Sequence, residues 1–356
     1  MLPFLVANFK SGMLPPPQSS GVFCTLLKKL GNTMAWDAEK KQQAAGHETQ
    51  KELHPHFMSA SSSSAVFPSA KRSFGLRIFQ DLLERKACCS PQIQINKPLD
   101  LQPEADEIRI LLLGDTGSGD GDQRRVAEAS AKTCDERGGD LVLLLGDNFI
   151  QHGVSGIQDP QFRSKFEDIY PHDLPFYAIL GNHDLRGNWR AQVEYTNHST
   201  RWIMPDVNYA FRAGPVELLG INTTCTICSL WTLQHPRTCP WRLVFGHRAL
   251  VTQGRHRGMN WLERRFVRAS TPDLYCSGHN HLLEHVHWQG IDQITSGGGG
   301  NPIHPADLNA APAEFLHEGF GYVWLHFCGT ELVARFFDDH GAELYGFQRT
   351  LPGRST

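Results

Sequence analysis

Gly146-Asp147-Asn148-Phe149 and Gly181-Asn182-His183-Asp184 are the two stretches that decide the fold of this chain. Each follows an apolar run, Leu141 to Leu145 and Phe176 to Leu180, which the pattern predicts to be a buried β-strand. A polar side chain of a metal-ligand type therefore stands where a strand ends and a loop begins. In open α/β sheets that edge is where ligands bind, so both stretches predict a site there.

Three further fragments repeat this arrangement: Gly114-Asp115, Gly246-His247 and Gly278-His279-Asn280-His281. In each, a glycine precedes the polar residue, which allows the backbone to turn sharply and to approach a bound ion closely. The combined set of carboxylate, amide and imidazole donors suits two first-row divalent or trivalent metals. Two metals in one site can clamp the attacking and leaving oxygens of a phosphoryl displacement. The candidate ligands are Asp115, Asp147, Asn182, His247, His279 and His281.

The ordered fragments resemble the calcineurin-like metallophosphoesterases and, within them, the small purple acid phosphatases of the tartrate-resistant type. The resemblance also includes Phe166-Glu167-Asp168 and Pro175-Phe176-Tyr177. It implies an α/β fold, specifically a four-layer α/β/β/α sandwich of the metallophosphoesterase type, over residues 106–352. It also implies two metal ions, with iron, manganese and zinc all open.

The resemblance assigns a role to each candidate ligand. Asp147 is expected to bridge the two metals. Asp115 and His281 would complete metal one, and metal two would be completed by Asn182, through its amide oxygen, His247 and His279.

Metal one is where this sequence departs from the family pattern. Gly117 stands where most metallophosphoesterases have a histidine, and Ile150 stands where purple acid phosphatases have a tyrosine. Three alternatives remain open: a water fills the gap, His152 on the same loop swings in, or metal one binds weakly. The loss of tyrosinate also removes a hard anionic donor for ferric iron, so the resemblance does not imply a mixed-valence iron centre.

The resemblance also suggests groups that act on the substrate. His183 is the candidate general acid or leaving-group stabiliser, with Asp184 orienting or polarising it. His256 resembles the family's second substrate-facing histidine, against the alternative of a solvated loop residue. Arg248 can clamp phosphate as a bidentate donor or simply lie on the surface. Asn148 is expected to support the ligands and is grouped with the substrate-binding residues.

Two other motifs have a structural alternative. The run Gly297 to Gly300 lacks the Lys-Ser/Thr of a P-loop, so packing is the favoured explanation. Cys225 and Cys228, with Cys239, can hold zinc or form a redox pair, but reduced thiols are favoured. The chain between Asn182 and His247 is shorter than the resemblance implies. This predicts a reduced or absent helix around Thr224 to Pro240 and puts the support of His247 in question.

The coarse pattern predicts a β-α-β unit, with a helix from Gln123 to Arg137 that ends at Gly138-Gly139. Further helices are expected from Asp159-Pro160 to Ile169 and from Gly258 to Ala269. A closing antiparallel meander is predicted at Tyr322 to Phe327, Glu331 to Phe337 and Leu344 to Thr350.

Residues 1–105 are predicted to be a low-complexity and disordered region, because they are rich in Ser and Pro and lack a sustained hydrophobic period. The formal net charge of −3 argues against a nucleic-acid surface. No apolar run is long enough to span a membrane. No standard signal peptide is visible, which favours the cytoplasm, whereas the resembled family is largely exported; location and oligomeric state stay open.

The predicted function is a binuclear metal-dependent phosphoester hydrolase acting on small phosphoesters. We expect a phosphomonoesterase, similar to an acid phosphatase, in which a metal-bound hydroxide attacks phosphorus in line. A phosphodiesterase is the alternative that uses the same site. A degenerate, non-catalytic metal-binding or scaffold protein is the alternative from another class.

Overall fold

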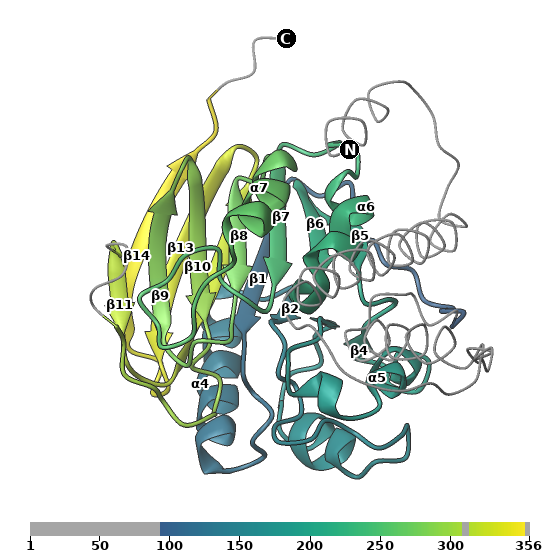
Figure 1. The fold of residues 1–356 in the computed structure, drawn as a ribbon. Helices are drawn as coiled ribbons and strands as arrows, with labels where there is room; N and C mark the ends of the chain where they lie inside the picture. Colours follow the sequence, from purple (N-terminus) through teal and green to yellow (C-terminus); the bar gives the residue numbers. More distant parts are fainter. Residues whose placement is uncertain (1–92, 308–312, 353–356) are drawn as a thin grey trace, which may run out of the picture. The chain divides into compact units, whose positions relative to one another are not determined.

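The computed structural model describes residues 93–307 and 313–352 (Figure 1). The sequence-based prediction of disorder for residues 1–92 lies outside these residues. Among the helices described, none is both long and apolar enough to cross a membrane.

The first β-sheet carries three of the five ligand fragments, those of Asp115, Asp147 and Asn182. Its strand order is β14-β13-β12-β1-β2-β3-β4, with β1 to β4 parallel and β12 to β14 forming an antiparallel meander beside β1. The predicted meander is therefore confirmed. The bounds are β1 Glu107–Leu113, β2 Leu141–Leu144, β3 Phe176–Ala178, β4 Trp202–Ile203, β12 Gly321–Cys328, β13 Glu331–Asp338 and β14 Glu343–Thr350.

The second β-sheet carries the histidine fragments. Its strand order is β11-β9-β10-β8-β7-β6-β5, with β6, β7, β8 and β10 parallel and the remaining strands antiparallel to their neighbours. The bounds are β5 Tyr209–Ala213, β6 Val216–Ile221, β7 Trp241–Gly246, β8 Leu274–Ser277, β9 Leu283–Trp288, β10 Ile291–Ser296 and β11 Phe315–His317.

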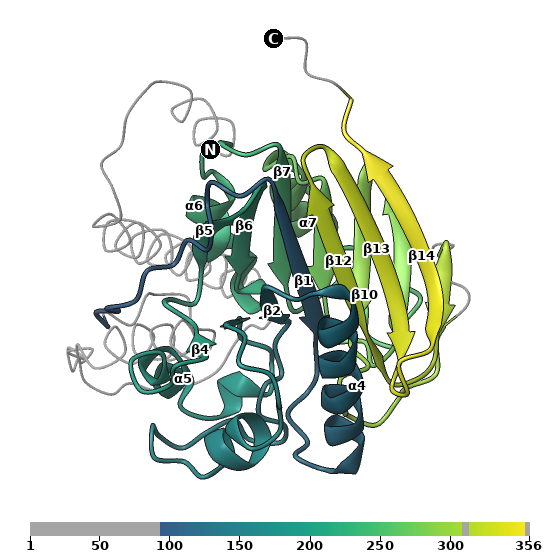
Figure 2. The ribbon, with the colours of Figure 1, turned by 180° about the vertical axis from the view of Figure 1, so that it is seen from behind.

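The two sheets pack face to face, and helices cover their outer faces. Ile110 and Leu112 of β1 join Leu243 and Phe245 of β7 in one buried cluster between the sheets. Successive residues of a strand point to opposite faces, so Leu111 packs on the other side with residues of α4 (Gly121–Arg137) and α5 (Trp189–Tyr195). A third cluster joins the second sheet to α7 (Trp261–Ala269). Figure 1 shows α7 and Figure 2 shows α4 on these opposite faces. The four-layer α/β/β/α sandwich is confirmed.

The helix ends follow local chemistry. The side chain of Asp120 accepts hydrogen bonds from the backbone N–H groups of Asp122 and Gln123 and begins α4, which ends at Gly138 with φ 84°. Asn260 and Glu263 form a capping box, so α7 begins at Trp261 and not at Gly258 as predicted. The predicted helix after Pro160 is shorter and has a π-helical turn, η1 (Arg163–Glu167).

The connection before β7 has little helix, as predicted. It holds the 3₁₀ helix η3 (Thr223–Ser229) and a single four-residue turn, α6 (Leu230–Leu233). A buried ion pair supports β7 in its place. Nε of Arg242 on β7 donates to Glu217 of β6 at 2.6 Å, and Nη1 donates to the Ser270 carbonyl at 2.7 Å. These hydrogen bonds hold β7, the strand that leads to His247, against β6 and against the end of α7.

Replacing Arg242 by Ala is expected to lower the free energy of unfolding by about 3–5 kcal/mol, because Glu217 would keep a buried charge without its main partner. Urea denaturation measures this change. The control is Arg335→Ala, which removes a partly exposed pair with Glu343 and is expected to change stability by about 1 kcal/mol or less. Equal effects of the two substitutions would contradict the assigned role of the buried pair.

Residues 93–105, which the sequence analysis placed in the N-terminal region, pack on the sandwich. Leu99 and Leu101 contact the core between the sheets. The hydroxyl of Tyr177 donates to the Leu99 carbonyl at 2.7 Å, and the amide of Leu101 donates to the Arg212 carbonyl at 2.8 Å. The packed part of the chain therefore begins before residue 106.

This packing predicts different results for two truncations. Deleting residues 1–92 is expected to leave the urea midpoint and the hydrolytic activity close to those of the full chain, given the Ser- and Pro-rich composition. Deleting residues 1–105 is expected to lower the free energy of unfolding by about 2 kcal/mol or more, because Leu99 and Leu101 are lost. Insoluble or inactive protein from the shorter deletion would contradict the first expectation.

Candidate metal centre

The candidate ligands gather at the carboxyl ends of parallel strands from both sheets. Asp115 follows β1 and Asp147 follows β2, while His247 directly follows β7 and His279 follows β8. Asn182 lies on the loop after β3. The fold therefore brings ligands together from loops that are far apart in the sequence, at the edge where the strand pattern predicted them.

Three of these ligands have unusual backbone angles. Asp115, Asp147 and His279 have φ values of 57°, 53° and 69°. Such left-handed conformations are uncommon for residues other than glycine and concentrate at functional sites. The glycines beside them provide the space: a Cβ on Gly181 would lie 2.1 Å from the Asp147 carboxylate, and one on Gly146 would lie 2.7 Å from the His247 ring. These glycines therefore allow the ligand loops to pack closely against one another, whereas the predicted approach of their backbone to a bound ion stays a prediction.

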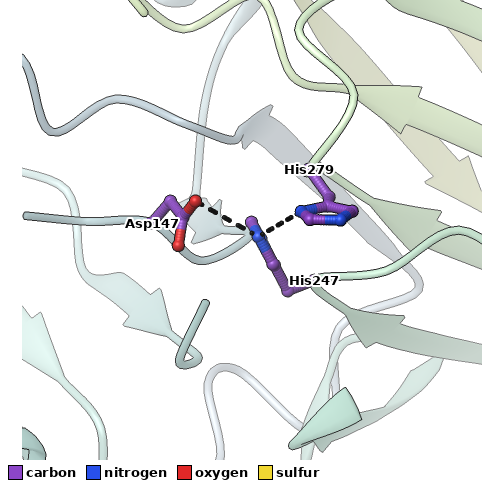
Figure 3. Close-up of side chains that lie close together, drawn as sticks. All are labelled: Asp147, His247 and His279. Carbon is purple, nitrogen blue, oxygen red and sulfur yellow. Dashed lines mark hydrogen bonds and ion pairs between the residues drawn. The ribbon is translucent and has the colours of Figure 1, made fainter. Parts of the chain in front are cut away.

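Asp147, His247 and His279 form a compact donor group (Figure 3). Their ligand atoms all lie within 4.8 Å of one another. Nε2 of His247 lies 3.4 Å from the Asp147 carboxylate, 3.1 Å from Nδ1 of His279 and 3.2 Å from the amide oxygen of Asn182. Nδ1 of His247 donates to the Leu145 carbonyl at 2.8 Å, which directs Nε2 to the other donors. These are the residues expected for metal two, and their donor atoms fit one cation.

The charges of this group also favour a cation. Burial lowers the pKa of His247, but the Asp147 carboxylate raises it by more, to about 9. Burial and the neighbouring His247 lower the pKa of His279 to about 2. Near neutral pH His247 is therefore the positively charged ring of this pair and His279 is neutral. Metal binding would displace the added proton of His247, as it does at other imidazole sites.

Asp115 and His281, expected at metal one, lie close together but are less tightly assembled. Oδ1 of Asp115 is buried, has no hydrogen-bond partner among the residues described, and lies 3.5 Å from Nε2 of His281. His281 donates from Nδ1 to the Pro302 carbonyl at 2.7 Å, which turns its Nε2 toward Asp115. An unpaired buried carboxylate oxygen fits a metal site. Within the described chain, however, only the Asp147, His247 and His279 group meets the 4.8 Å spacing.

The structure shows how the loops accommodate Gly117 and Ile150, the two positions where metal one departs from the family pattern. A Cβ on Gly117 would lie 2.5 Å from the Asn148 backbone, so the position lacks space for the family's histidine. The amide of Ile150 donates to the Gly117 carbonyl, which binds this loop to that glycine. The side chain of His152 is exposed, and His152 is not part of the metal-ligand group in the described chain. The structure does not bring His152 into the centre.

His183 and Asp184 lie differently from the sequence-based expectation. The amide of His183 donates to Asp147 at 2.8 Å, and its half-buried ring lies with Nε2 3.9 Å from the same carboxylate. Burial lowers the pKa of His183. Asp184 is fully buried and accepts hydrogen bonds from the Gly181 amide, at 2.8 Å, and from other groups of the two loops, Asn148, Phe149 and Gln192. The expected contact in which Asp184 polarises His183 is absent from these bonds, so Asp184 joins the two ligand loops to each other.

Burial has a large effect on Asp184 itself. Burial, and then the charge of Asp147, raises the pKa of Asp184 to about 7. Its several backbone donors oppose this rise because they stabilise the ionised carboxylate. The hydrogen bonds that join Asp184 to the two loops therefore offset part of the effect of burial on its pKa.

Two expected substrate contacts have other partners. The guanidinium of Arg248 donates to Glu263 at 3.2 Å and to the Gly258 carbonyl at 3.3 Å, so it links its loop to α7 instead of standing free for phosphate. Asn148 is buried and its amide donates to the Ile179 carbonyl at 2.8 Å. Its grouping with the substrate-binding residues is not supported, whereas a supporting role beside Asp147 is consistent with these contacts.

His256 stands at the centre, together with a residue that the sequence analysis missed. The rings of His256 and His279 lie 4.5 Å apart, and the His256 amide donates to the Asn280 side chain at 2.7 Å. His304 places its ring 5.5 Å from that of His256 and 4.3 Å from that of His281. The only signal for His304 in the sequence is a histidine between two prolines after the glycine run.

The remaining motifs have structural explanations. A Cβ on Gly299 would lie 2.3 Å from the Gly114 carbonyl, so the predicted packing role of the glycine run is confirmed. The sulfur of Cys239 accepts a hydrogen bond from Arg212, and the sulfurs of Cys225 and Cys228 lie 2.6 Å apart. Among the described residues, no metal-ligand group includes these cysteines.

Comparisons with known proteins agree with this geometry. The family description "Calcineurin-like phosphoesterase" matches residues 108–283. Tartrate-resistant acid phosphatase type 5 of Rattus norvegicus is 35% identical over 306 residues, which cover 70% of this chain and 92% of that protein. Purple acid phosphatase 3 of Arabidopsis thaliana is 29% identical over 294 residues, covering 70% of this chain and 80% of the relative.

A solved structure shows the same fold. It is described as "GAP50 the anchor in the inner membrane complex of Plasmodium", with a TM-score of 0.62 and 22% identity over 70% of this chain and 90% of that chain. Together with the ligand residues at the strand ends, these likenesses place the chain in a family. It belongs to the calcineurin-like phosphoesterases, is homologous to the purple acid phosphatases including the tartrate-resistant type, and is a phosphatase-like hydrolase.

Proposed function

We propose that this protein is a phosphomonoesterase that uses two metal ions. The ions are iron, manganese or zinc. The observation that supports this most is the position of Asp147. It belongs to the compact group with His247 and His279, while its other oxygen accepts the amide of His183. The unpaired Oδ1 of Asp115 and Nε2 of His281 provide donors for the second ion.

The bound ions would supply a nucleophilic water and neutralise charge on the phosphoryl oxygens. The side chains of the chain do the rest. His183 holds Nε2 near Asp147 with 26% of its side chain exposed, which places a proton donor at the mouth of the centre for the departing alcohol. His256 presents its partly exposed ring beside His279 and is placed to donate to a phosphoryl oxygen. Asp184 keeps the loops of Asp147 and Asn182 in register.

Hydrolysis of paired model substrates tests this function. Metal-stripped protein is reloaded separately with iron, manganese, zinc or magnesium and assayed with p-nitrophenyl phosphate and bis-p-nitrophenyl phosphate. We expect kcat/KM to be higher for the monoester with at least one metal. A higher value for the diester would identify a phosphodiesterase instead, and no turnover of either ester with two ions bound would contradict the proposal.

A non-catalytic metal-binding or scaffold protein is the second candidate, and one observation favours it. The metal-one donors are not preassembled, because Gly117 and Ile150 remove two family ligands and His152 lies outside the centre. The similar solved structure is described as an anchor, a word that refers to that protein. Elemental analysis separates the candidates: the phosphatase retains close to two metals per chain, and the scaffold retains one or none and has no turnover.

Iron-loaded protein is expected to lack the visible band of a tyrosinate–ferric charge transfer, because Ile150 supplies no phenolate. The buried tyrosines are engaged elsewhere: the hydroxyl of Tyr209 donates to the Ala178 carbonyl and that of Tyr170 accepts from Gln123. Ile150→Tyr is expected to introduce the band and to tighten iron binding. Absorption spectra of the two iron-loaded proteins measure this, and a strong band in the wild type would contradict the assignment of metal one.

A further inference from the structure

We propose that His304 is a ligand of metal one and supplies the donor that Gly117 and Ile150 do not. This inference rests on the proposed function, since it concerns the second of its two metal sites. Without His304, metal one has only Asp115, His281 and the shared Asp147 as protein donors. An additional imidazole is the kind of ligand that iron, zinc and manganese sites accept.

The position of His304 is the first argument. Five histidine rings follow one another around the centre: the ring of His247 is 4.8 Å from that of His279, and distances of 4.5, 5.5 and 4.3 Å separate the subsequent pairs. His304 occupies the place between His256 and His281. Its ring is nearly parallel to that of His281, with an angle of 16° between their planes. His304 therefore lies at the metal-one end of this series.

The second argument is an unpaired nitrogen. Nδ1 of His304 is buried and has no hydrogen-bond partner in the described part of the chain. Oδ1 of Asp115 is also buried without a hydrogen bond, and its ion-pair contact with Nε2 of His281 is long, at 3.5 Å. Buried polar atoms nearly always have a partner, and an ion is one explanation when two such atoms occur at one site. A single cation would satisfy both of them.

The third argument is the loop that carries His304. The amide of Asn301 donates to the Asp115 carbonyl at 3.2 Å, and its side-chain amide donates to the same oxygen at 2.5 Å. The next residue, Pro302, accepts the hydrogen bond of His281. Pro302 lies two residues before the histidine and Pro305 directly after it, and each restricts the loop backbone at its own position. The loop is thus anchored on the two metal-one ligands and presents His304 to them.

Ligation requires a rearrangement of the His304 side chain. The donor atoms of Asp115, His281 and His304 do not all lie within 4.8 Å of one another. The His304 side chain must therefore turn from its stack on His281 toward Asp115 when the ion binds. The movement that we propose is a rotation about the side-chain bonds of His304. The loop backbone does not need to move, because its hydrogen bonds already hold it beside Asp115.

Cobalt binding to the full-length chain tests the proposal. Metal-stripped protein is titrated with Co²⁺ by calorimetry, and retained cobalt is counted after dialysis. His304→Phe keeps a ring to stack on His281 but removes the donor, and His304→Asp restores a donor. His340→Phe is the control, because His340 is exposed on the turn between β13 and β14.

We expect the wild type and His340→Phe to bind two Co²⁺ ions. His304→Phe should bind the ion at the Asp147, His247 and His279 group normally, which shows that the variant is folded, and the other ion at least about tenfold more weakly. His304→Asp should recover part of that affinity.

Two ions bound by His304→Phe with wild-type affinity would overturn the proposal. The same result with weaker inhibition by inorganic phosphate would overturn it in favour of a substrate-binding role for His304. If the wild type binds two ions and hydrolyses phosphate esters while His304→Phe binds like the wild type, only this inference fails. If the wild type never binds a second ion, the proposed two-metal function fails together with it.

Discussion

Replacing Asp147 by Asn is expected to lower kcat for p-nitrophenyl phosphate by on the order of 10³-fold, because an amide cannot hold two cations as a carboxylate does. The change is nearly isosteric, and an Asn oxygen can still accept the His183 amide, so the fold should remain. Retained metal, measured by elemental analysis, should fall in parallel. The effect is large because Asp147 contributes to both proposed metal sites.

Asp173→Asn is the matched control for this substitution. Asp173 is an exposed carboxylate on the loop before β3, so its loss should leave both kcat and metal content unchanged. A variant Asp147→Asn that kept more than about a tenth of the wild-type kcat would exclude the bridging role.

Replacing His183 by Ala should reduce kcat by roughly 10²-fold or more, the usual effect of losing a general acid. Metal content should hardly change, because the hydrogen bond from His183 to Asp147 is donated by the backbone amide, which alanine keeps, and the ring itself lies 3.9 Å from that carboxylate. Steady-state kinetics and elemental analysis of the same preparation measure both quantities. A large fall in kcat without a loss of metal identifies His183 as a general acid and not as a metal ligand.

His198→Ala provides the comparison for His183, since His198 is exposed at the end of α5. It should behave as the wild type in both measurements. A loss of metal from His183→Ala would show that the division between ligands and acid is wrong, and an unchanged kcat would remove His183 from the reaction.

The parts of the fold that could be predicted from the sequence are those with uninterrupted apolar strands. β1, β2 and β7 contain uninterrupted apolar runs, at Ile110–Leu113, Leu141–Leu144 and Leu243–Phe245, because both faces of the strand are buried there. β9 was not predicted, since its buried residues include Glu284 and His285. Glu284 accepts the Gln253 amide and His285 lies 3.1 Å from Asp292, so long-range partners satisfy residues that look like a loop in the sequence.

The residues of the candidate site also divide into those with a local sequence signature and those that depend on contacts between distant loops. Ligands such as Asp147 and His247 could be predicted, because each has a local signature of strand, glycine and donor. The contacts of Arg248 with Glu263 and of Asp184 with the neighbouring loop could not, because they depend on which loops the fold brings together. His304 has no local signature and joins the centre only through its loop's contacts with Asp115 and His281.

Activity measured against bound metal tests the central claim most directly. Metal-stripped full-length protein is titrated with Mn²⁺ or Zn²⁺, and hydrolysis of p-nitrophenyl phosphate is plotted against metal per chain. We expect activity to appear mainly as the second equivalent binds and to reach its plateau at two ions per chain. A plateau at one ion per chain, or no hydrolysis with two ions bound, would contradict it.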